Sequence, residues 1–231
     1  MSQRKCAVYC LSRALYESVL PSLKSLLLHT NVDRVYLLIE DDTLPFALPR
    51  VCQCINVSRQ PYFRHDGPNY KNRWTWMVLM RAALAHILPQ EDTVLSLDAD
   101  TIIIDDISAA WDTPLDGCYW AGAREPKKSR DDFYYANAGV ALFNLKALRD
   151  GKTDAIITEL NKNWHAYPEQ DVLSDLCQGH IAKLPSDYNA TFFTEPTQTP
   201  KIIHFAARAN WRGEALVKAF ETIPFEQMMR N

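Results

Sequence analysis

The chain has 231 residues, of which 47% are apolar and 23% charged, an ordinary balance for a globular protein. Its net charge of −3 supplies no field that would attract nucleic acid or an anionic membrane, so neither is an expected partner. No apolar run approaches the roughly 20 residues that cross a bilayer, so no transmembrane segment is expected.

Strand-like and helix-like segments alternate along the first part of the chain. Residues 5–11, 34–40 and 52–57 are short, apolar and rich in β-favouring side chains, which predicts three strands. After the first of them, Ser18 is a candidate N-cap and Pro21 falls in the first turn of a helix. Leucines at helical spacing indicate that one face of this helix packs on a sheet.

The later segments continue the alternation. The pattern predicts a helix over residues 72–88, ended by Pro89, and a strand over residues 93–97. Further strands are expected at residues 140–143 and 201–205 in a more mixed second half. Strands that alternate with helices predict an α/β fold with a mainly parallel central sheet.

Two aspartates stand between intensely apolar runs in the stretch TVLSLDADTIIID, residues 93–105. Two carboxylates as close as Asp98 and Asp100 repel each other and are costly to bury, and a divalent cation such as Mg²⁺ or Mn²⁺ resolves both problems. Ligands of open α/β sheets bind outside the carboxyl ends of strands, and Asp98 follows such a strand directly. On the residues alone, a pair of aspartates that solvate a surface turn stays open as an alternative.

A second alternative is the chemistry of haloacid-dehalogenase-type phosphatases. These enzymes also place two aspartates after a buried strand, and the first aspartate is the nucleophile. Their pattern needs Thr or Val two residues past the second aspartate, where this chain has Ile102. Their motif also usually opens the domain, whereas Asp98 lies well inside the chain, so the segment fits this chemistry poorly.

The six cysteines show no zinc-type pairing, because Cys52 and Cys54 are separated by one residue rather than two. Nothing in the sequence marks the chain as secreted, which argues against disulfides. We therefore expect buried reduced thiols and a cytoplasmic location.

Four segments in order resemble glycosyltransferase family 8, the family of glycogenin and the bacterial lipopolysaccharide galactosyltransferases. They are RAALAHILPQEDTVLSLDADTII at residues 81–103, YANAGVALFNL at 135–145, YPEQDVLSDL at 167–176 and KIIHF at 201–205. The resemblance implies a Rossmann-like nucleotide-diphospho-sugar transferase fold of the GT-A type. It also implies one glycosyltransferase domain over residues 1–231, with a nucleotide-binding half at 1–105 and an acceptor- and sugar-binding half at 106–231.

The reaction that the resemblance implies is a metal-dependent transfer of a hexose, glucose or galactose, with retention of the anomeric configuration. The expected donor is a nucleotide-diphosphate sugar, UDP-linked, and the expected cation is Mn²⁺ or Mg²⁺. The expected acceptor is a hydroxyl group on a glycan, a lipid-linked sugar or a protein, and a homodimer stays open. The alternative is a non-catalytic nucleotide-sugar-binding protein on the same fold.

The family's site residues carry over onto matching positions. Asp98, Asp100 and His204 become the expected metal ligands, and mixed carboxylate and imidazole ligation suits Mn²⁺. Without the resemblance, a histidine after an apolar strand is compatible with a plain core position. The expected contacts to the donor come from Ser12, Arg13, Arg81, Asp98, Ala99, Asp100 and Arg208. The expected catalytic residues around the sugar are Asn137, Gln170 and Asp171.

The chain departs from the family pattern in three places. Ser12 and Arg13 stand where the family has acidic residues that hold uracil, so we expect weaker discrimination between bases. Glu169 replaces the first aspartate of the family's Asp-Gln-Asp segment and is one methylene longer. After the histidine the family has a glycine and a lysine before a tryptophan, but this chain reads FAARANW, and Arg208 is the predicted replacement for the lysine's charge.

Overall fold

A seven-stranded sheet forms the centre of the protein, as seen in a computed structural model that describes residues 4–224. Its strands follow the spatial order β3-β2-β1-β4-β7-β6-β8. The first four strands along the chain are mutually parallel, and β7 runs antiparallel to both of its neighbours. The predicted α/β fold with a mainly parallel sheet is therefore confirmed. The strands are β1 (Cys6–Cys10), β2 (Arg34–Ile39), β3 (Cys52–Asn56), β4 (Thr93–Leu97), β6 (Trp120–Arg124), β7 (Ala136–Asn144) and β8 (Ile181–Lys183).

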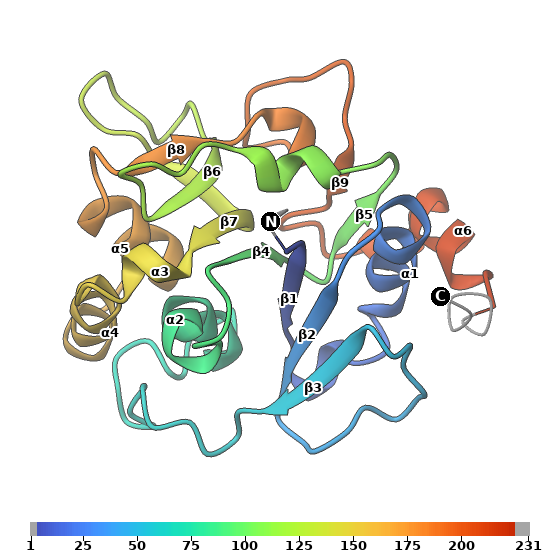
Figure 1. The fold of residues 1–231 in the computed structure, drawn as a ribbon, viewed down its shortest axis with the longest axis horizontal. Coiled ribbons are helices and arrows are strands. Elements are labelled where there is room, and N and C mark those ends of the chain that lie inside the picture. Colours follow the sequence, from blue (N-terminus) through green and yellow to red (C-terminus); the bar gives the residue numbers. More distant parts are fainter. Residues whose placement is uncertain (1–3, 225–231) are drawn as a thin grey trace.

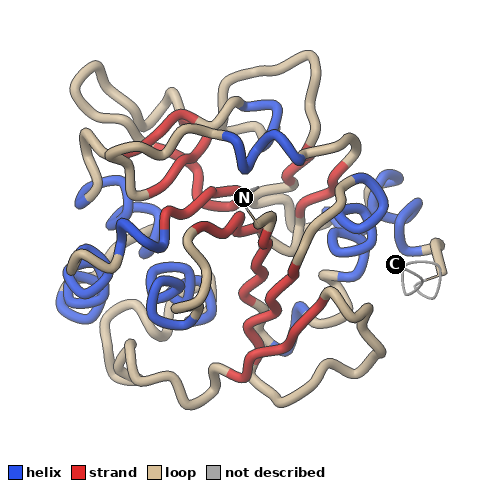
Figure 2. Tube along the Cα trace, viewed as in Figure 1, coloured by secondary structure: helices blue, strands red, loops and turns tan. Residues whose placement is uncertain are grey.

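Helices cover both faces of this sheet (Figures 1 and 2). Along β1, Cys6 and Val8 pack toward one layer, while Ala7 and Tyr9 pack toward the other, as the alternation of side chains in a strand requires. Burial on both faces explains why the strands are almost continuously apolar. One layer contains η2 (Trp76–Ala83), α2 (Leu84–Ile87), α3 (Leu145–Leu148), α4 (Lys152–Lys162) and α5 (Pro168–Leu176), and the other contains α1 (Leu20–His29) and α6 (Ala215–Glu221).

A second, two-stranded sheet lies beside the first and joins distant parts of the chain. Its antiparallel strands are β5 (Thr101–Ile103) and β9 (Ile202–His204). Ile102 is fully buried in a small core with Phe205 and Trp211, which explains the apolar run after Asp100. The remaining short 3₁₀ helices are η1 (Arg13–Leu15), η3 (Ser108–Asp112), η4 (Ser186–Tyr188) and η5 (Trp211–Gly213).

Three elements differ from the sequence-based prediction. The helix predicted at residues 72–88 begins only at Trp76 and is mostly 3₁₀, because Thr75 has a φ of 70°, which a helix cannot contain. The first helix is capped by Val19 rather than Ser18, whose hydroxyl instead accepts a hydrogen bond from Arg212. Strand β7 begins earlier than predicted, since its Asn-Ala-Gly start pairs with β6 across a register shift instead of forming a turn.

Two further expectations concern the whole chain. Within residues 4–224, no helix is both long enough and apolar enough to cross a membrane. All six cysteines are free thiols, with Cys6 and Cys177 buried and the other four partly buried. The expected reduced state agrees with this arrangement.

Candidate active site

A cavity of about 440 Å³ opens at the carboxyl ends of β1 and β4. Cys10, the last residue of β1, and Asp98, the residue after β4, both line it. The chain leaves β1 for β2 on one side of it and returns to β4 on the other, so the cavity lies at the switch point where open α/β sheets bind ligands. Because β7 is antiparallel to β4, its first residues, including Asn137 and Gly139, reach the same edge.

The turn that carries the two aspartates is fixed by buried hydrogen bonds. The backbone N–H of Asp98 donates to the carbonyl of Gly139 at 2.8 Å, and the hydroxyl of Thr101 donates to the carbonyl of Asp98 at 2.8 Å. That hydroxyl continues a buried chain through Ser22 to Tyr9, with both oxygen–oxygen distances at 2.9 Å. Strand β1 and helix α1 thus hold the position of the turn.

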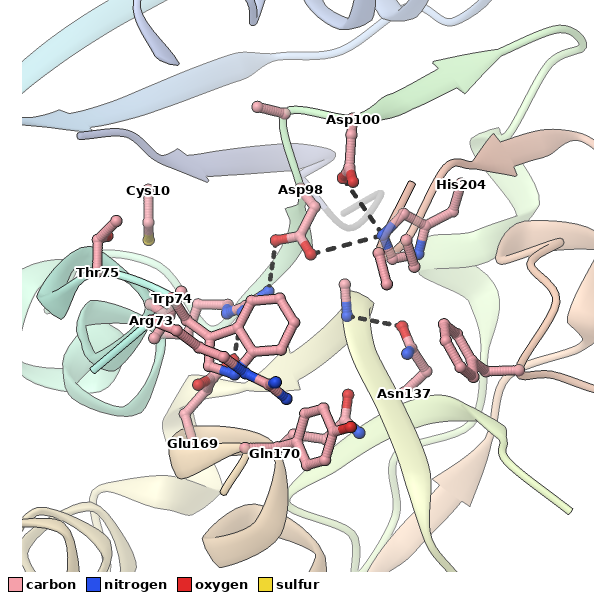
Figure 3. Close-up of a pocket in the computed structure, with 18 of the residues that line it drawn as sticks. Cys10, Arg73, Trp74, Thr75, Asp98, Asp100, Asn137, Glu169, Gln170 and His204 are labelled. Atoms are coloured by element: carbon pink, nitrogen blue, oxygen red, sulfur yellow. Dashed lines mark hydrogen bonds and ion pairs between the residues drawn. The ribbon is translucent and has the colours of Figure 1, made fainter. Parts of the chain in front are cut away.

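His204 meets these aspartates because β9 pairs with β5, which places it directly opposite Thr101. Its Nε2 lies 3.3 Å from Asp100 Oδ1 and 3.6 Å from Asp98 Oδ2 (Figure 3). One ligand atom from each of the three residues lies within 4.8 Å of the others. On the far side of the ring, Nδ1 is 2.8 Å from Asn189 Oδ1, an acceptor, so Nδ1 carries a proton and Nε2 is the ring nitrogen that faces the carboxylates.

The charged groups in this cluster shift one another's pKa values. Burial alone would lower the pKa of His204, but Asp100 and Asp98 outweigh it and raise that pKa above its ordinary value. Burial would raise the pKa of Asp100, but His204 outweighs it and lowers that pKa. For Asp98, burial prevails over the opposing charge of Arg81 and raises the pKa. Hard oxygen ligands with one imidazole fit Mn²⁺ or Mg²⁺, which would relieve this mutual repulsion.

Gly139 leaves the space that the cluster needs. A Cβ at this position would lie 2.1 Å from His204 Cε1 and 2.8 Å from Asp98 Oδ2. Any larger residue would therefore displace both side chains. The requirement explains why glycine stands in the Asn-Ala-Gly segment of β7.

Arg81 is buried beneath the cluster and holds two carboxylates. Its Nη1 donates to Asp98 Oδ1 at 2.7 Å and to the carbonyl of Ala138 at 2.9 Å, and its Nη2 donates to Glu169. The guanidinium binds Asp98 through Oδ1 only, so Oδ2 stays directed toward His204. Arg81, predicted to contact the donor, lines the cavity, and its hydrogen bonds fix the side chain of Asp98.

Two predicted catalytic residues, Asn137 and Gln170, line the cavity next to a buried carboxylate, that of Glu125. The amide of Gln170 donates to Glu125 at 3.2 Å and to the hydroxyl of Tyr135 at 3.0 Å, while its oxygen accepts from a backbone N–H of β7. Asn137 donates to Glu125 at 2.7 Å and accepts from Asn189 at 3.0 Å. These amides are held rigidly at the cavity wall.

Four predicted site residues do not line this cavity. Asp171 lies behind it and accepts hydrogen bonds from the hydroxyl of Tyr135 and the backbone N–H of Tyr167. The side chain of Arg208 is 58% exposed and pairs with Glu214 at 3.3 Å. Asp171 lies in the first turn of α5, where its carboxylate accepts from the backbone N–H of Tyr167. Arg208 follows Ala207, whose left-handed φ of 61° sets the direction of the chain there.

Ser12 and Arg13 are the other two predicted site residues that do not line the cavity. Arg13 makes a two-pronged ion pair with Asp41, at 2.8 and 2.9 Å, and is exposed at the edge of the molecule. From the same segment, Leu15 lines the cavity. An ion pair with a side chain beyond β2 could not be predicted from the local sequence.

Sequence reasoning missed several residues of the cavity wall. Glu125 in the wall, and Asn189 behind it in contact with Asn137 and His204, carry no local motif, and only the fold brings them to the site. Gly139 could have been singled out, because a glycine inside an apolar strand often marks a close approach. Other missed wall residues include Arg73, Thr75, Lys128, Tyr167 and Phe193.

Comparison with known proteins decides the family. Residues 39–211 match the model of glycosyl transferase family 8. The chain belongs to this family. The phosphatase alternative is therefore set aside.

Relatives and solved structures agree with this membership. The lipopolysaccharide 1,2-glucosyltransferase of Escherichia coli (strain K12) is 30% identical over 115 residues, which are 44% of this chain and 34% of that protein. The match thus spans about a third of the relative's length.

Three solved glycosyltransferases share the fold. Glycosyltransferase GlyE of Streptococcus pneumoniae TIGR4 has a TM-score of 0.73 at 19% identity, over 99% of this chain and 62% of that one. Galactosyltransferase LgtC, solved with donor and acceptor sugar analogs, has a TM-score of 0.70 at 19% identity, over 96% and 98%. Mouse xyloside xylosyltransferase 1 has a TM-score of 0.62 at 16% identity, over 89% and 98%. The predicted GT-A type fold is confirmed.

Proposed function

We propose that the protein is a metal-dependent, retaining hexosyltransferase that moves glucose or galactose from a nucleotide-diphosphate sugar, UDP-linked, to a hydroxyl acceptor. The observation that carries the proposal is the cluster of Asp98, Asp100 and His204 at the wall of the cavity at the carboxyl ends of β1 and β4. A cavity of about 440 Å³ is of the size that binds a small ligand. Family membership supports a nucleotide-sugar donor for that ligand.

In this proposal Asp98, Asp100 and His204 hold Mn²⁺ or Mg²⁺. When bound, the cation supplies Lewis-acid stabilisation of the diphosphate leaving group. Arg81 keeps Asp98 in place, and Asn189 accepts from Nδ1 of His204, which would leave Nε2 as the ring nitrogen directed at the cation. The protein therefore needs little rearrangement when the cation arrives.

The sugar would lie against Gln170, Asn137 and the carboxylates of Glu125 and Glu169. Departure of the diphosphate leaves positive charge on the anomeric carbon, and preorganised carboxylate and amide oxygens stabilise such charge. Gln170 is well suited to this because both of its amide hydrogens are already bound, which fixes its oxygen at the wall. Asp171 would act indirectly, by holding Tyr135, which in turn accepts from Gln170.

Other parts of the proposal rest on the family and on relatives. The division into a nucleotide-binding half, residues 1–105, and a sugar- and acceptor-binding half, residues 106–231, comes from the family pattern. The name of the Escherichia coli relative supports glucose as the sugar and a glycan as the acceptor. The free thiols support a reducing compartment such as the cytoplasm.

The test is donor turnover. A panel of UDP-, GDP- and dTDP-linked hexoses is incubated with the protein and Mn²⁺, and the released nucleoside diphosphate is measured with and without excess chelator. The proposal predicts release from at least one donor, loss of release in chelator, and loss in Asp98→Asn. Tight donor binding without any release would favour the non-catalytic alternative, and release that persists in chelator would refute the metal dependence.

A further inference from the structure

The donor site lacks the lysine that the family pattern places after the histidine. Loss of the sugar leaves a nucleoside diphosphate with more negative charge than the bound donor, so cations besides the metal are needed around it. Arg208 was the predicted replacement, but it pairs with Glu214 and does not line the cavity. The missing charge has to come from elsewhere in the wall.

Three long basic side chains line the cavity: Arg73, Arg81 and Lys128. Arg81 is neutralised by two carboxylates beneath the cluster. The ammonium of Lys128 lies 3.6 Å from Glu125 and donates to the hydroxyl of Tyr135 at 3.1 Å. Among these three, and within residues 4–224, only Arg73 has no carboxylate partner.

Aromatic rings hold Arg73 in place instead of carboxylates. Its guanidinium carbon lies 4.5 Å from the ring centre of Trp74 and 5.4 Å from that of Tyr167. Trp74 is itself anchored, since its indole N–H donates to the carbonyl of Ala166 at 3.1 Å and its backbone N–H donates to Asn72 at 2.6 Å. Stacking uses the face of a guanidinium and leaves the N–H groups at its edge free to bind phosphate oxygens.

The backbone next to Arg73 is strained at the cavity wall. Thr75 has a φ of 70°, a conformation that costs free energy for any residue except glycine, and it lines the cavity. Its hydroxyl accepts from the N–H of Met77 at 3.2 Å and so ties this turn to the start of η2. In Figure 3, Arg73, Trp74 and Thr75 lie together on one side of the cavity, with His204 on the other side and Asp98 between them.

We propose that Arg73 replaces the family's lysine and binds the diphosphate of the donor and of the product. This inference rests on the proposed function, because it assumes that a nucleoside diphosphate enters the cavity. Arg73 and the cation site then flank the diphosphate, while Arg81 and Lys128 remain bound to carboxylates. An unpaired arginine on an aromatic platform is suited to this task, because it gives up no ion pair when the diphosphate binds.

The test measures binding by titration calorimetry in Mn²⁺. UDP, GDP, dTDP and ADP are compared on the wild type, and the tightest is compared with its own nucleoside, which lacks the diphosphate. Arg73→Met is expected to weaken binding of the nucleoside diphosphate about 10- to 100-fold, the range of one charge-assisted contact, and to leave binding of the nucleoside unchanged. Arg73→Lys keeps the positive charge but loses the planar pair of N–H donors of the guanidinium. Its affinity for the nucleoside diphosphate should therefore lie between those of the wild type and Arg73→Met.

Arg208→Met is the matched control, and it should bind the diphosphate within about twofold of wild type, because Arg208 pairs with Glu214 and does not line the cavity. Should Arg73→Met misfold, Arg73→Lys carries the test, and it must still weaken the diphosphate selectively. Wild-type affinity in both Arg73 variants, or a larger loss in Arg208→Met, would overturn the inference and leave the proposed function standing. Equal losses for nucleoside and diphosphate would also overturn it. A wild type that binds none of the four diphosphates would instead remove the proposed function itself.

Discussion

Replacing Gly139 by alanine should destroy the proposed metal site while most of the protein stays folded. The new methyl would lie 2.1 Å from His204 Cε1, whereas non-bonded carbons settle at about 3.5–4.0 Å. The imidazole must therefore retreat by at least about 1.4 Å, while ligand distances in metal sites hold within about 0.2 Å. The same methyl lies 2.8 Å from Asp98 Oδ2, so a second ligand is pushed away as well.

The size of the effect follows from this displacement. Changes to groups that only orient a ligand cost about 10- to 100-fold in metal affinity, so moving two ligands should cost at least about 100-fold. Overpacking should lower the free energy of unfolding by only about 1–3 kcal/mol. Mn²⁺ titration followed by electron paramagnetic resonance measures the affinity, and chemical denaturation measures the stability.

Gly213→Ala is the control for this experiment, because a Cβ at Gly213 meets no atom within 4 Å. It should bind Mn²⁺ as the wild type does. Wild-type Mn²⁺ affinity in Gly139→Ala would refute the reasoning, since it would mean that the cluster beside Gly139 is not the metal site.

Four further outcomes are expected. Asp100→Asn should abolish both Mn²⁺ binding and donor turnover with an unchanged circular-dichroism spectrum, and turnover at the wild-type rate would contradict its role. Asn189→Ala should lower Mn²⁺ affinity about 10- to 100-fold, because His204 loses the acceptor that fixes its tautomer; unchanged affinity would count against this. The carboxylates raise the pKa of His204, so protons should compete with Mn²⁺ from a pH above about 6.5, the ordinary histidine value. Below the raised pKa the apparent affinity should fall about tenfold per pH unit, and a flat profile in titrations would exclude His204 as a ligand. UDP should be preferred over GDP and dTDP by a modest margin in a competition assay, whereas a wild type that accepts a single nucleotide would show that other residues read the base.

The core strands could be predicted because their signal is local. Strand β4 and the aspartates after it were placed correctly, since the apolar run and the sudden pair of carboxylates lie within a few residues of each other. The helix predicted from residue 72 failed at its start, where the left-handed Thr75 overrides helical spacing. No periodicity in a sequence reveals such a turn.

The site was harder, because its parts come from distant segments. His204 reaches Asp100 only through the pairing of β5 with β9, and in the sequence only the family resemblance connected them. Charge alone singled out Arg208, but the side chain's direction depends on the backbone around Ala207 and on Glu214. Asn189 and Arg73 gave no signal, since an amide in a loop and an arginine beside a tryptophan are common.

The position of the bound metal is the most direct test of the proposed function. Crystals grown with Mn²⁺ and the tightest nucleoside diphosphate, measured at the manganese absorption edge, locate the ion by its anomalous scattering. We predict one strong peak within coordination distance of Asp98, Asp100, His204 and the diphosphate oxygens, with Glu169 and Arg81 outside that distance. A peak elsewhere in the cavity, or a bound diphosphate with no manganese beside these three residues, would contradict this prediction.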